Sequence, residues 1–298
     1  MGPAAMLPVL RVGAPMWAFR PWVGTFLPAG TRHGHELAAY AAILSAVEGN
    51  TTFYASPPAT TVARWAEQAP PDFRFVFKVP REITHERRLR DVQRPIGEFV
   101  DLLAPLADRI GALSIQLPAS FGPNDLGALA GLVRSLPRGV HWCVEVRHPG
   151  LFDGAPLRTL ERILGENDVE RVQFDTATLF AAPPSSDGER EAWRVKPRVP
   201  VLVEALTDRP VIRYIGRDDP DATRGGWSRW VDACERWVGE GRSPIVFVHT
   251  PDNHLAPGLA REFHEAVRTR LPDLPALGPL PPHEPDGGGE QQAQPSLF

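Results

Sequence analysis

Short apolar runs with the alternation of β-strands recur along this chain, separated by amphipathic or Ala/Leu-rich segments typical of helices. Eight such strand–helix repeats are present. Eight is the number of repeats in a closed (β/α)8 barrel, in which all strands are parallel. We expect strands at residues 8–13, 45–53, 73–79, 112–117, 141–147, 170–175, 210–216 and 244–250, and helices at 35–44, 57–68, 96–108, 123–135, 155–164, 198–206, 227–239 and 257–270.

An open, doubly wound sheet is the main alternative for such a chain, and it usually carries a Gly-rich nucleotide-binding turn. The sequence has neither a G-x-G-x-x-G motif nor a Walker loop. We therefore predict an α/β fold with one TIM-type barrel domain over residues 1–272. Residues 273–298 are dense in Pro, Gly and Gln and lack periodicity, which predicts a disordered tail. The polar connection at 181–197 predicts a flexible surface loop, with a lid over the barrel mouth as the alternative.

Charge and cysteine content narrow the class of protein. A net charge of −4 and a pI near 6.2 argue against a generally basic nucleic-acid binder, although a local basic patch remains open. Cys143 and Cys234 have neither CxxC nor zinc-ribbon spacing, which suits a reducing cytoplasm. No run approaches the roughly 18 apolar residues of a membrane span, so we expect a cytoplasmic protein with no membrane partner.

The phase of the strands predicts where polar groups gather. Alternate side chains of a strand face opposite sides, and one phase of the expected strands is almost wholly apolar, as packing beneath helices requires. The other phase places polar groups near the C-terminal strand ends, where barrels of this type concentrate their sites. This polar set is Glu48, Asn50, Lys78, Ser114, Gln116, Glu145, Arg147, Gln173, Asp175, Arg213 and His249.

Several blocks of the sequence resemble, in order, those of the YecE-like proteins (domain of unknown function 72). The blocks are PWVGTFLP, VEGNTTFY, PPDFRFVFKVPREITHERRL, RIGALSIQLPASFGP, VEVRHP, VIRYIGRDD and VFVHTPDNHLAP. The resemblance covers roughly residues 8–272 and implies a TIM-type barrel, but no established activity. Ile215 stands where many of these relatives have a His, which disfavours any mechanism that needs imidazole at that position.

Basic side chains at the strand ends indicate an anionic substrate, small or polymeric. Lys78, Arg213 and Arg217, with His85 nearby, could hold a phosphate or carboxylate, because Arg offers a fork of donors and Lys a point charge. Residues 81–94 add five arginines after the third strand and could contact nucleic acid. The alternative for that segment is a solvated face in which Glu82, Glu86 and Asp91 pair with the arginines.

We expect an enzyme with general acid–base chemistry at the barrel mouth, and Glu145 is the leading general base. The candidate catalytic residues are Glu145, Lys78, Asp175 and His249, and the candidate substrate-binding residues are Glu48, Asn50, His85, Gln116, Arg147, Arg213 and Arg217. Glu48, Glu145, Asp175 and His249 could instead converge on a metal. No short metal-ligand motif is present, and an interior in which cations neutralise the acids is favoured, so the cofactor stays unknown.

The last five residues, Gln294 to Phe298, resemble the peptide by which bacterial replication and repair proteins bind the sliding clamp. A Gln amide and a Leu-Phe pair at the end of a flexible tail could dock into a pocket of the clamp. A chance apolar terminus explains the match equally well. The match suggests, as a second hypothesis, a DNA-maintenance accessory protein or a nuclease-like barrel tethered to the clamp. A non-catalytic binding module is the third.

We expect a labelled C-terminal peptide to bind a bacterial sliding clamp, with Leu297 and Phe298 buried and Gln294 hydrogen-bonded at the pocket edge. Burial of two such side chains contributes roughly 3–5 kcal/mol before ordering costs, so the affinity should be micromolar or weaker. Fluorescence polarisation measures this binding. Binding that does not saturate, or that survives Leu297→Ala combined with Phe298→Ala, would leave the motif as a chance match.

Overall fold

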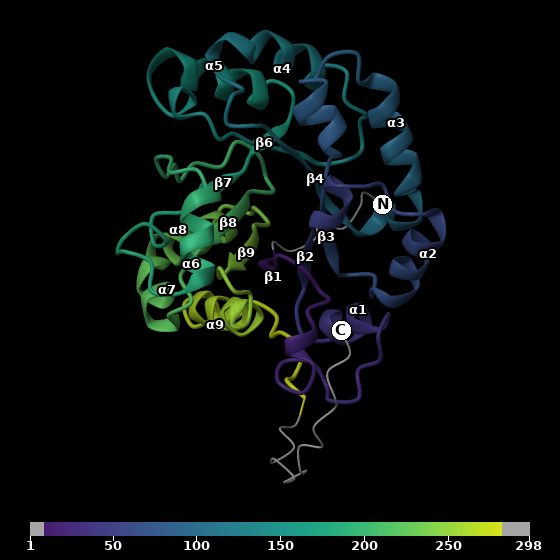
Figure 1. The fold of residues 1–298 in the computed structure, drawn as a ribbon, viewed down its shortest axis with the longest axis vertical. Coiled ribbons are helices and arrows are strands. Elements are labelled where there is room, and N and C mark those ends of the chain that lie inside the picture. The colour runs from purple at the N-terminus through teal and green to yellow at the C-terminus, as the bar shows by residue number, and fades with distance from the viewer. Residues whose placement is uncertain (1–8, 282–298) are drawn as a thin grey trace, which may run out of the picture.

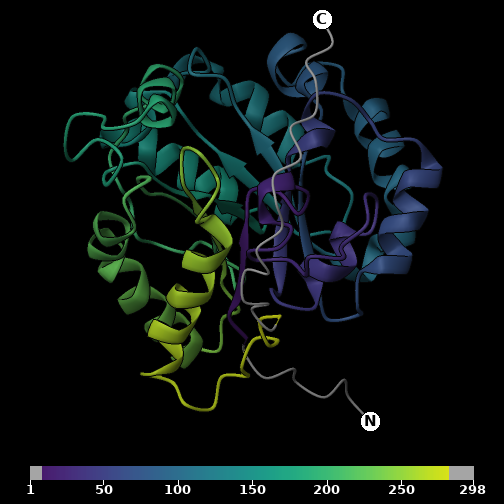
Figure 2. The ribbon, with the colours of Figure 1, turned by 60° about the horizontal axis from the view of Figure 1, so that its bottom comes forward.

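The computed structural model describes residues 9–281, and nine parallel strands in this range form one sheet that curls into a nearly closed barrel. Helices surround the strands on the outside (Figures 1 and 2). The strands are β1 (Arg11–Ala14), β2 (Ala46–Gly49), β3 (Arg74–Lys78), β4 (Ile110–Gln116), β5 (Trp142–Glu145), β6 (Val169–Arg171), β7 (Gln173–Asp175), β8 (Val211–Ile215) and β9 (Ile245–His249). The helices are α1 (Glu36–Ala41), α2 (Ala59–Gln68), α3 (Gln93–Leu102), α4 (Leu126–Val133), α5 (Gly154–Gly165), α6 (Asp187–Val195), α7 (Pro220–Gly226), α8 (Ser228–Gly239) and α9 (Ala256–Arg268).

The barrel closes through its sixth strand, which changes partners halfway along. β6 pairs with β5, while β7, only one residue later in the chain, pairs with β8. The residue between them, Val172, donates its backbone N–H to Val144 O at 2.9 Å and so ends the ladder with β5. The single strand expected at 170–175 is therefore β6 and β7 together, and the predicted barrel is confirmed.

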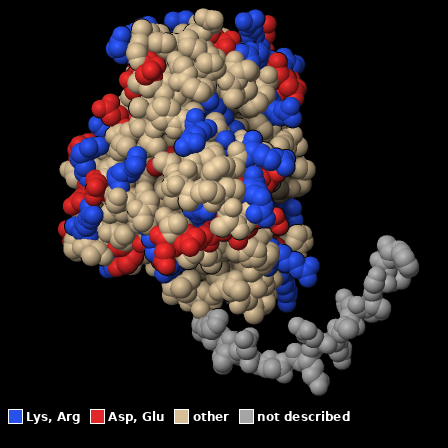
Figure 3. Space-filling view, turned by 60° about the vertical axis from the view of Figure 1, so that its left-hand side comes forward, with Lys and Arg blue, Asp and Glu red and all other residues tan. Residues whose placement is uncertain are grey.

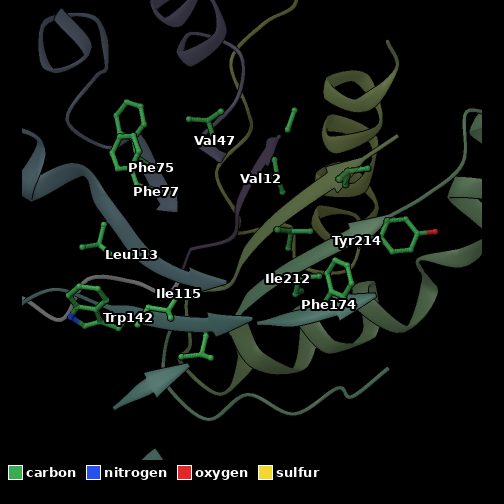
Figure 4. Packing of buried hydrophobic residues seen from close by; sticks show 14 of the residues in the cluster. Val12, Val47, Phe75, Phe77, Leu113, Ile115, Trp142, Phe174, Ile212 and Tyr214 are labelled. Carbon is green, nitrogen blue, oxygen red and sulfur yellow. The ribbon is translucent and has the colours of Figure 1, made fainter. Parts of the chain in front are cut away.

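Two apolar layers hold the sheet. Outside, large side chains such as Phe75, Phe77 and Trp142 pack between the strands and the helices (Figure 4). Inside, a smaller buried cluster comprises Ala46, Val76, Ala112, Cys143, Val172, Val211, Ile245 and Phe247. Most of these inner residues come two positions before a polar residue of the predicted set, so the interior is apolar below and polar toward the C-terminal strand ends.

The predicted phase of the sixth strand is wrong. Asp175 does not face the interior, because its Oδ2 accepts a hydrogen bond from Trp230 Nε1 of α8 at 2.8 Å. Gln173 likewise turns outward and donates to Glu204 O at 2.7 Å. Val172 and Phe174 occupy the inner face instead. Residues 172–175 alternate between apolar and polar side chains. This alternation shows that the two sets face opposite sides, but it does not decide which set faces the interior.

The polar connection at 181–197 is not a flexible loop but contains helix α6. Ser186 caps the helix by accepting a hydrogen bond from Glu189 N at 3.0 Å. The Glu189 carboxylate is fully buried and pairs with Arg217, whose Nη2 lies 2.6 Å from its Oε2. Glu189 also accepts the backbone N–H of Asp218 at 3.1 Å. These bonds fasten α6 to the loop after β8.

The helix expected at 198–206 is absent, and the chain there has no regular secondary structure. Pro200 interrupts the segment and cannot donate a helical hydrogen bond. The buried carboxylate of Glu170 holds the end of the segment, because it accepts the backbone N–H groups of Leu206 and Thr207 at 3.2 and 3.0 Å. Burial raises the pKa of Glu170 to about 7, although hydrogen bonds from Thr207 and Leu206 oppose the rise.

Packing extends beyond the predicted domain boundary at residue 272. Leu274 is buried, and Arg261 of α9 donates to Gly278 O at 2.6 Å and to Ile43 O at 3.1 Å. Residues 282–298, which include the clamp-motif residues Gln294, Leu297 and Phe298, lie outside the described range. Within residues 9–281, no helix is both long and apolar enough to cross a membrane.

We expect Arg217→Met to destabilise the protein and to accelerate amide hydrogen exchange in α6. The substitution leaves the Glu189 carboxylate buried without its charge partner, which costs about 3–5 kcal/mol of unfolding free energy. Arg190→Met is the matched control on the same helix, because Arg190 pairs with the exposed Asp187 and should change stability by at most about 1 kcal/mol. Equal effects of the two substitutions in urea unfolding and exchange mass spectrometry would contradict this account.

Candidate functional site

A cavity of about 640 Å³ opens at the C-terminal mouth of the barrel. Its floor is formed by side chains from the ends of the strands, including Lys78 of β3, Gln116 of β4, Arg213 of β8 and His249 of β9. Helix α6 lies along one side and contributes residues from Gly188 to Val195. The segment predicted to be a loop or lid therefore forms a wall of the cavity.

Arg213 forms the centre of the site. It is only 3% exposed, and its Nε and Nη1 donate to Glu48 Oε1 and to Glu145 Oε2, respectively. Its Nη2 also contacts Glu48 Oε2 at 3.3 Å. One guanidinium thus joins carboxylates from β2 and β5 across the interior. Phe174 supports it with its ring centroid 5.5 Å from the guanidinium carbon.

The buried carboxylates of Glu48 and Glu145 are ionised, and guanidinium groups bind their oxygens. Burial alone would raise the pKa of each, but the charge of Arg213 holds both well below their ordinary value. Arg147 adds a second partner to Glu145, with Nε 2.6 Å from Oε1. Because both oxygens of Glu145 accept hydrogen bonds from guanidinium groups, and because it is fully buried, this residue is poorly suited to the predicted role of general base.

Lys78 is the most distinctive group in the cavity. Its side chain is buried, and its Nζ donates to the neutral carbonyl Oε1 of Gln116 at 2.7 Å and lies 5.9 Å from the centre of the Phe53 ring. Within residues 9–281 it forms no ion pair with a carboxylate, since Glu48 and Glu145 are taken by arginines. Burial, followed by the charge of Arg213, lowers the pKa of Lys78 to about 7. It can therefore gain or lose a proton near neutrality.

Two buried polar atoms beside the cavity lack a hydrogen-bond partner among the described residues. His249 Nε2 lies 3.2 Å from Glu48 Oε2 but outside hydrogen-bonding geometry, and burial lowers the pKa of this imidazole to about 4. Asn50 donates to Pro15 O at 2.7 Å, while its Oδ1 is unpaired. Unsatisfied buried polar groups are rare in folded proteins and call for an explanation. Water in the cavity, as well as a ligand, can supply such partners.

The structure brings most of the predicted site residues together. Asn50, Lys78, His85, Gln116, Arg147, Arg213 and His249 line the cavity, and Glu48 and Glu145 lie directly beneath it through Arg213. Asp175 lies outside, bonded to α8. Arg217 does not reach the cavity either, because Glu189 and the carbonyl of Ala182 take its donors. The roles expected for Asp175 and Arg217 are therefore not supported by their positions.

The four side chains considered as metal ligands do not converge. Glu48 and His249 are neighbours, but Arg213 separates them from Glu145, and Asp175 lies beyond the barrel wall. In the part of the chain that the structure describes, no three His, Cys, Asp or Glu side chains are grouped to hold a metal ion. The donor set in the cavity is mainly cationic and does not fit a metal.

Lys196 and the apolar rim of the cavity were not among the predicted site residues. Lys196 follows α6 and lines the cavity, and burial, followed by the charge of Arg213, lowers its pKa to about 8. Phe53, Tyr54 and Val195 form much of the rim, and Tyr54 is 79% exposed. The rarity of lysine in this chain could have drawn attention to Lys196, whereas the rim depends on the position of α6.

The arginine-rich segment at the mouth is largely paired. Arg87 contacts Glu82 at 2.6 Å, and Arg88 contacts Asp125 at 2.9 Å. Arg94 reaches Glu98 at 3.5 Å. Figure 3 shows a different face, toward the left-hand side of Figure 1, on which basic and acidic side chains are likewise interspersed. The segment therefore matches the solvated, ion-paired alternative better than a nucleic-acid surface.

The chain matches the family described as "Protein of unknown function DUF72" over residues 11–285. It is 39% identical over 274 residues to the UPF0759 protein YecE of Escherichia coli (strain K12), which covers 92% of this chain and 98% of YecE. DUF72 family proteins of Enterococcus faecalis V583 and Thermotoga maritima MSB8 share the fold. Their TM-scores are both 0.62, at 20% and 21% identity, over 89% of this chain and 98% and 100% of theirs. The blocks that resemble YecE-like proteins and the barrel agree with these matches, and the chain belongs to the DUF72 family.

Proposed function

We propose that this protein is an enzyme that binds a small anionic substrate in the mouth cavity and uses Lys78 for proton transfer. The observation that carries the proposal is the excess of positive charge at the site. Arg213, Arg147 and Lys78 face two buried carboxylates. At the wall, Lys196 just after α6 and Arg81 add two cations against one further acid, Glu191, so an excess of positive charge remains. An anion with a phosphate or carboxylate group would balance this excess.

The charges divide into a fixed and a titratable part. Arginine supplies a permanent charge in proteins, and the carboxylate partners of Arg213 and Arg147 hold the two guanidinium groups in place. Lys78 can change its protonation state near pH 7, which is the property that a general acid or base requires. We therefore assign proton transfer to Lys78 rather than to Glu145, and anion binding to Arg147 and Lys196 with support from Arg213.

The shape of the cavity favours a small organic anion. The volume of about 640 Å³ lies within the range of small-molecule sites. The apolar rim of Phe53, Tyr54 and Val195 would contact the carbon skeleton of the substrate while its charged group reaches the floor. The pairing of the arginine-rich segment with acidic side chains does not favour the nucleic-acid alternative. A clamp tether rests on residues beyond 281 and stays a separate prediction.

We expect inorganic phosphate or malonate to bind saturably and to raise the thermal unfolding midpoint of the protein. Arg147→Gln and Lys196→Gln should each weaken this binding by about tenfold or more, because a hydrogen bond to a charged group contributes about 1.5–3 kcal/mol. Arg162→Gln is the control, since Arg162 pairs with exposed Glu166 on α5 away from the cavity. Absence of saturable binding, or equal affinity in all four proteins, would refute the anion site.

Lys78 should react with an amine-modifying reagent at unusually low pH. Only the deprotonated amine is nucleophilic, and the lowered pKa of Lys78 places the midpoint of its reactivity at about pH 7. Lys196 should follow with a midpoint at about pH 8. Quantitative acetylation over a pH series, read by peptide mass spectrometry, measures both residues in one experiment. A midpoint for Lys78 near the ordinary lysine value of about 10.4 would contradict the proposed role.

A further inference from the structure

The distribution of lysine in this protein is unusual. Lys78 and Lys196 are the only lysines among the 32 lysine and arginine residues of the sequence. All the others are arginine, including those in the surface ion pairs of the helices, such as Arg162 with Glu166 and Arg268 with Glu265. Both lysines nevertheless line the same cavity. The mouth cavity thus contains both lysines of a chain whose other basic side chains of the Lys/Arg type are all arginine.

A requirement for positive charge alone does not explain this choice. Arginine supplies a permanent charge, and Arg147 and Arg213 already do so in the cavity. What lysine adds is an amine that can lose its proton and then act as a nucleophile, which a guanidinium group does not do in proteins. The two lysines therefore indicate chemistry at nitrogen in addition to charge.

The surroundings of Lys78 suit a nucleophilic amine. Its Nζ is held by the carbonyl of Gln116 at 2.7 Å, a neutral partner that fixes the position of the amine without stabilising its charged form as a carboxylate would. The Phe53 ring shields it from one side. Glu48 and Glu145 keep their contacts with Arg213 and do not pair with Lys78. Desolvation next to other cations is a known way to activate a lysine amine.

We propose that Lys78 forms a covalent imine with an aldehyde or 2-oxo acid whose carboxylate or phosphate group is held by Arg147 and Lys196. This inference rests on the proposed anion site and names the class of its substrate. In it, the proton that Lys78 exchanges near neutral pH is the one whose loss frees the amine for attack. The lone pair of Nζ attacks the carbonyl carbon, and the carbonyl oxygen takes up a proton to give a carbinolamine. Loss of that oxygen as water then forms the C=N bond, so the net change is amine plus carbonyl to imine plus water.

Lys196 has a different place in this scheme. It lies immediately after α6, at the wall of the cavity, whereas Lys78 lies at the floor, at the end of β3. Its higher pKa, about 8, keeps it mostly protonated at neutral pH. We therefore assign it to the charged group of the substrate. An arginine at this position should replace its charge, whereas an arginine at position 78 should not replace the nucleophile.

Reductive trapping tests the proposal directly on the full-length protein. The protein is incubated with glyoxylate and sodium cyanoborohydride at neutral pH, and the modified peptides are identified by mass spectrometry. The chain offers only Lys78, Lys196 and the N-terminal amine as primary amines, so the assignment is unambiguous. We expect the adduct to form first on Lys78. Inorganic phosphate should suppress this adduct and leave modification of the N-terminal amine unchanged.

Two matched variants complete the test. Lys78→Arg should lose the adduct at position 78 and show no faster reaction elsewhere, whereas Lys196→Arg should retain the adduct on Lys78. Circular dichroism confirms that the variants are folded, and the peptide map of the unaltered protein decides the question even if one of them is not. Modification confined to Lys196 and the N-terminus, or modification of Lys78 that phosphate does not suppress, would overturn the proposal. Saturable phosphate binding without a Lys78 adduct would overturn the imine while leaving the anion site intact, and absence of both would overturn both.

Discussion

The burial of Arg213 between Glu48 and Glu145 is the interaction on which the site depends. Each carboxylate is almost inaccessible to solvent, and neither could remain ionised there without a cation at contact distance. The guanidinium satisfies both and so joins β2, β5 and β8 in the upper half of the barrel. Such a network adds little net stability, because desolvation offsets much of its attraction. Its more direct effect is to fix the positions of the Glu48 and Glu145 carboxylates.

This arrangement determines what the other side chains can do. Because Arg213 and Arg147 occupy both oxygens of Glu145, that residue serves to position two cations. The same occupancy leaves Lys78 without a carboxylate partner, so that burial can lower its pKa into the neutral range. The reactive amine is thus a consequence of the ion pairs beside it. A site with the same residues but a Lys78–Glu145 pair would hold a permanently charged lysine.

The sequence allowed the barrel and much of the site to be predicted because both depend on local periodicity. Eight repeats determined the closure, and the two-residue period of β2, β3, β4, β8 and β9 correctly placed Glu48, Lys78, Gln116, Arg213 and His249 around one interior. The period could not decide the orientation of the sixth strand, where Asp175 finds a partner in Trp230 from a helix 55 residues later. Contacts of that range leave no pattern in a single sequence. The absent helix at 198–206 has a similar cause, since the buried Glu170 accepts the backbone N–H of Leu206 and the half-buried Arg242 donates to Ala205 O.

Arg217 shows how a correct residue type can have a different role from the predicted one. It was expected to bind substrate, yet it anchors Glu189 and the carbonyls of Ala182 and Pro183 instead. Those contacts hold α6 against the mouth, and α6 ends immediately before Lys196. The Arg217 guanidinium therefore affects the cavity indirectly, because it anchors the helix that precedes Lys196. Because breaking this buried pair is costly, the position of α6, and with it the wall of the cavity, depends on Arg217. The positions of the two lysines in the cavity therefore depend on two separate sets of buried ion pairs, one centred on Arg213 and one on Arg217.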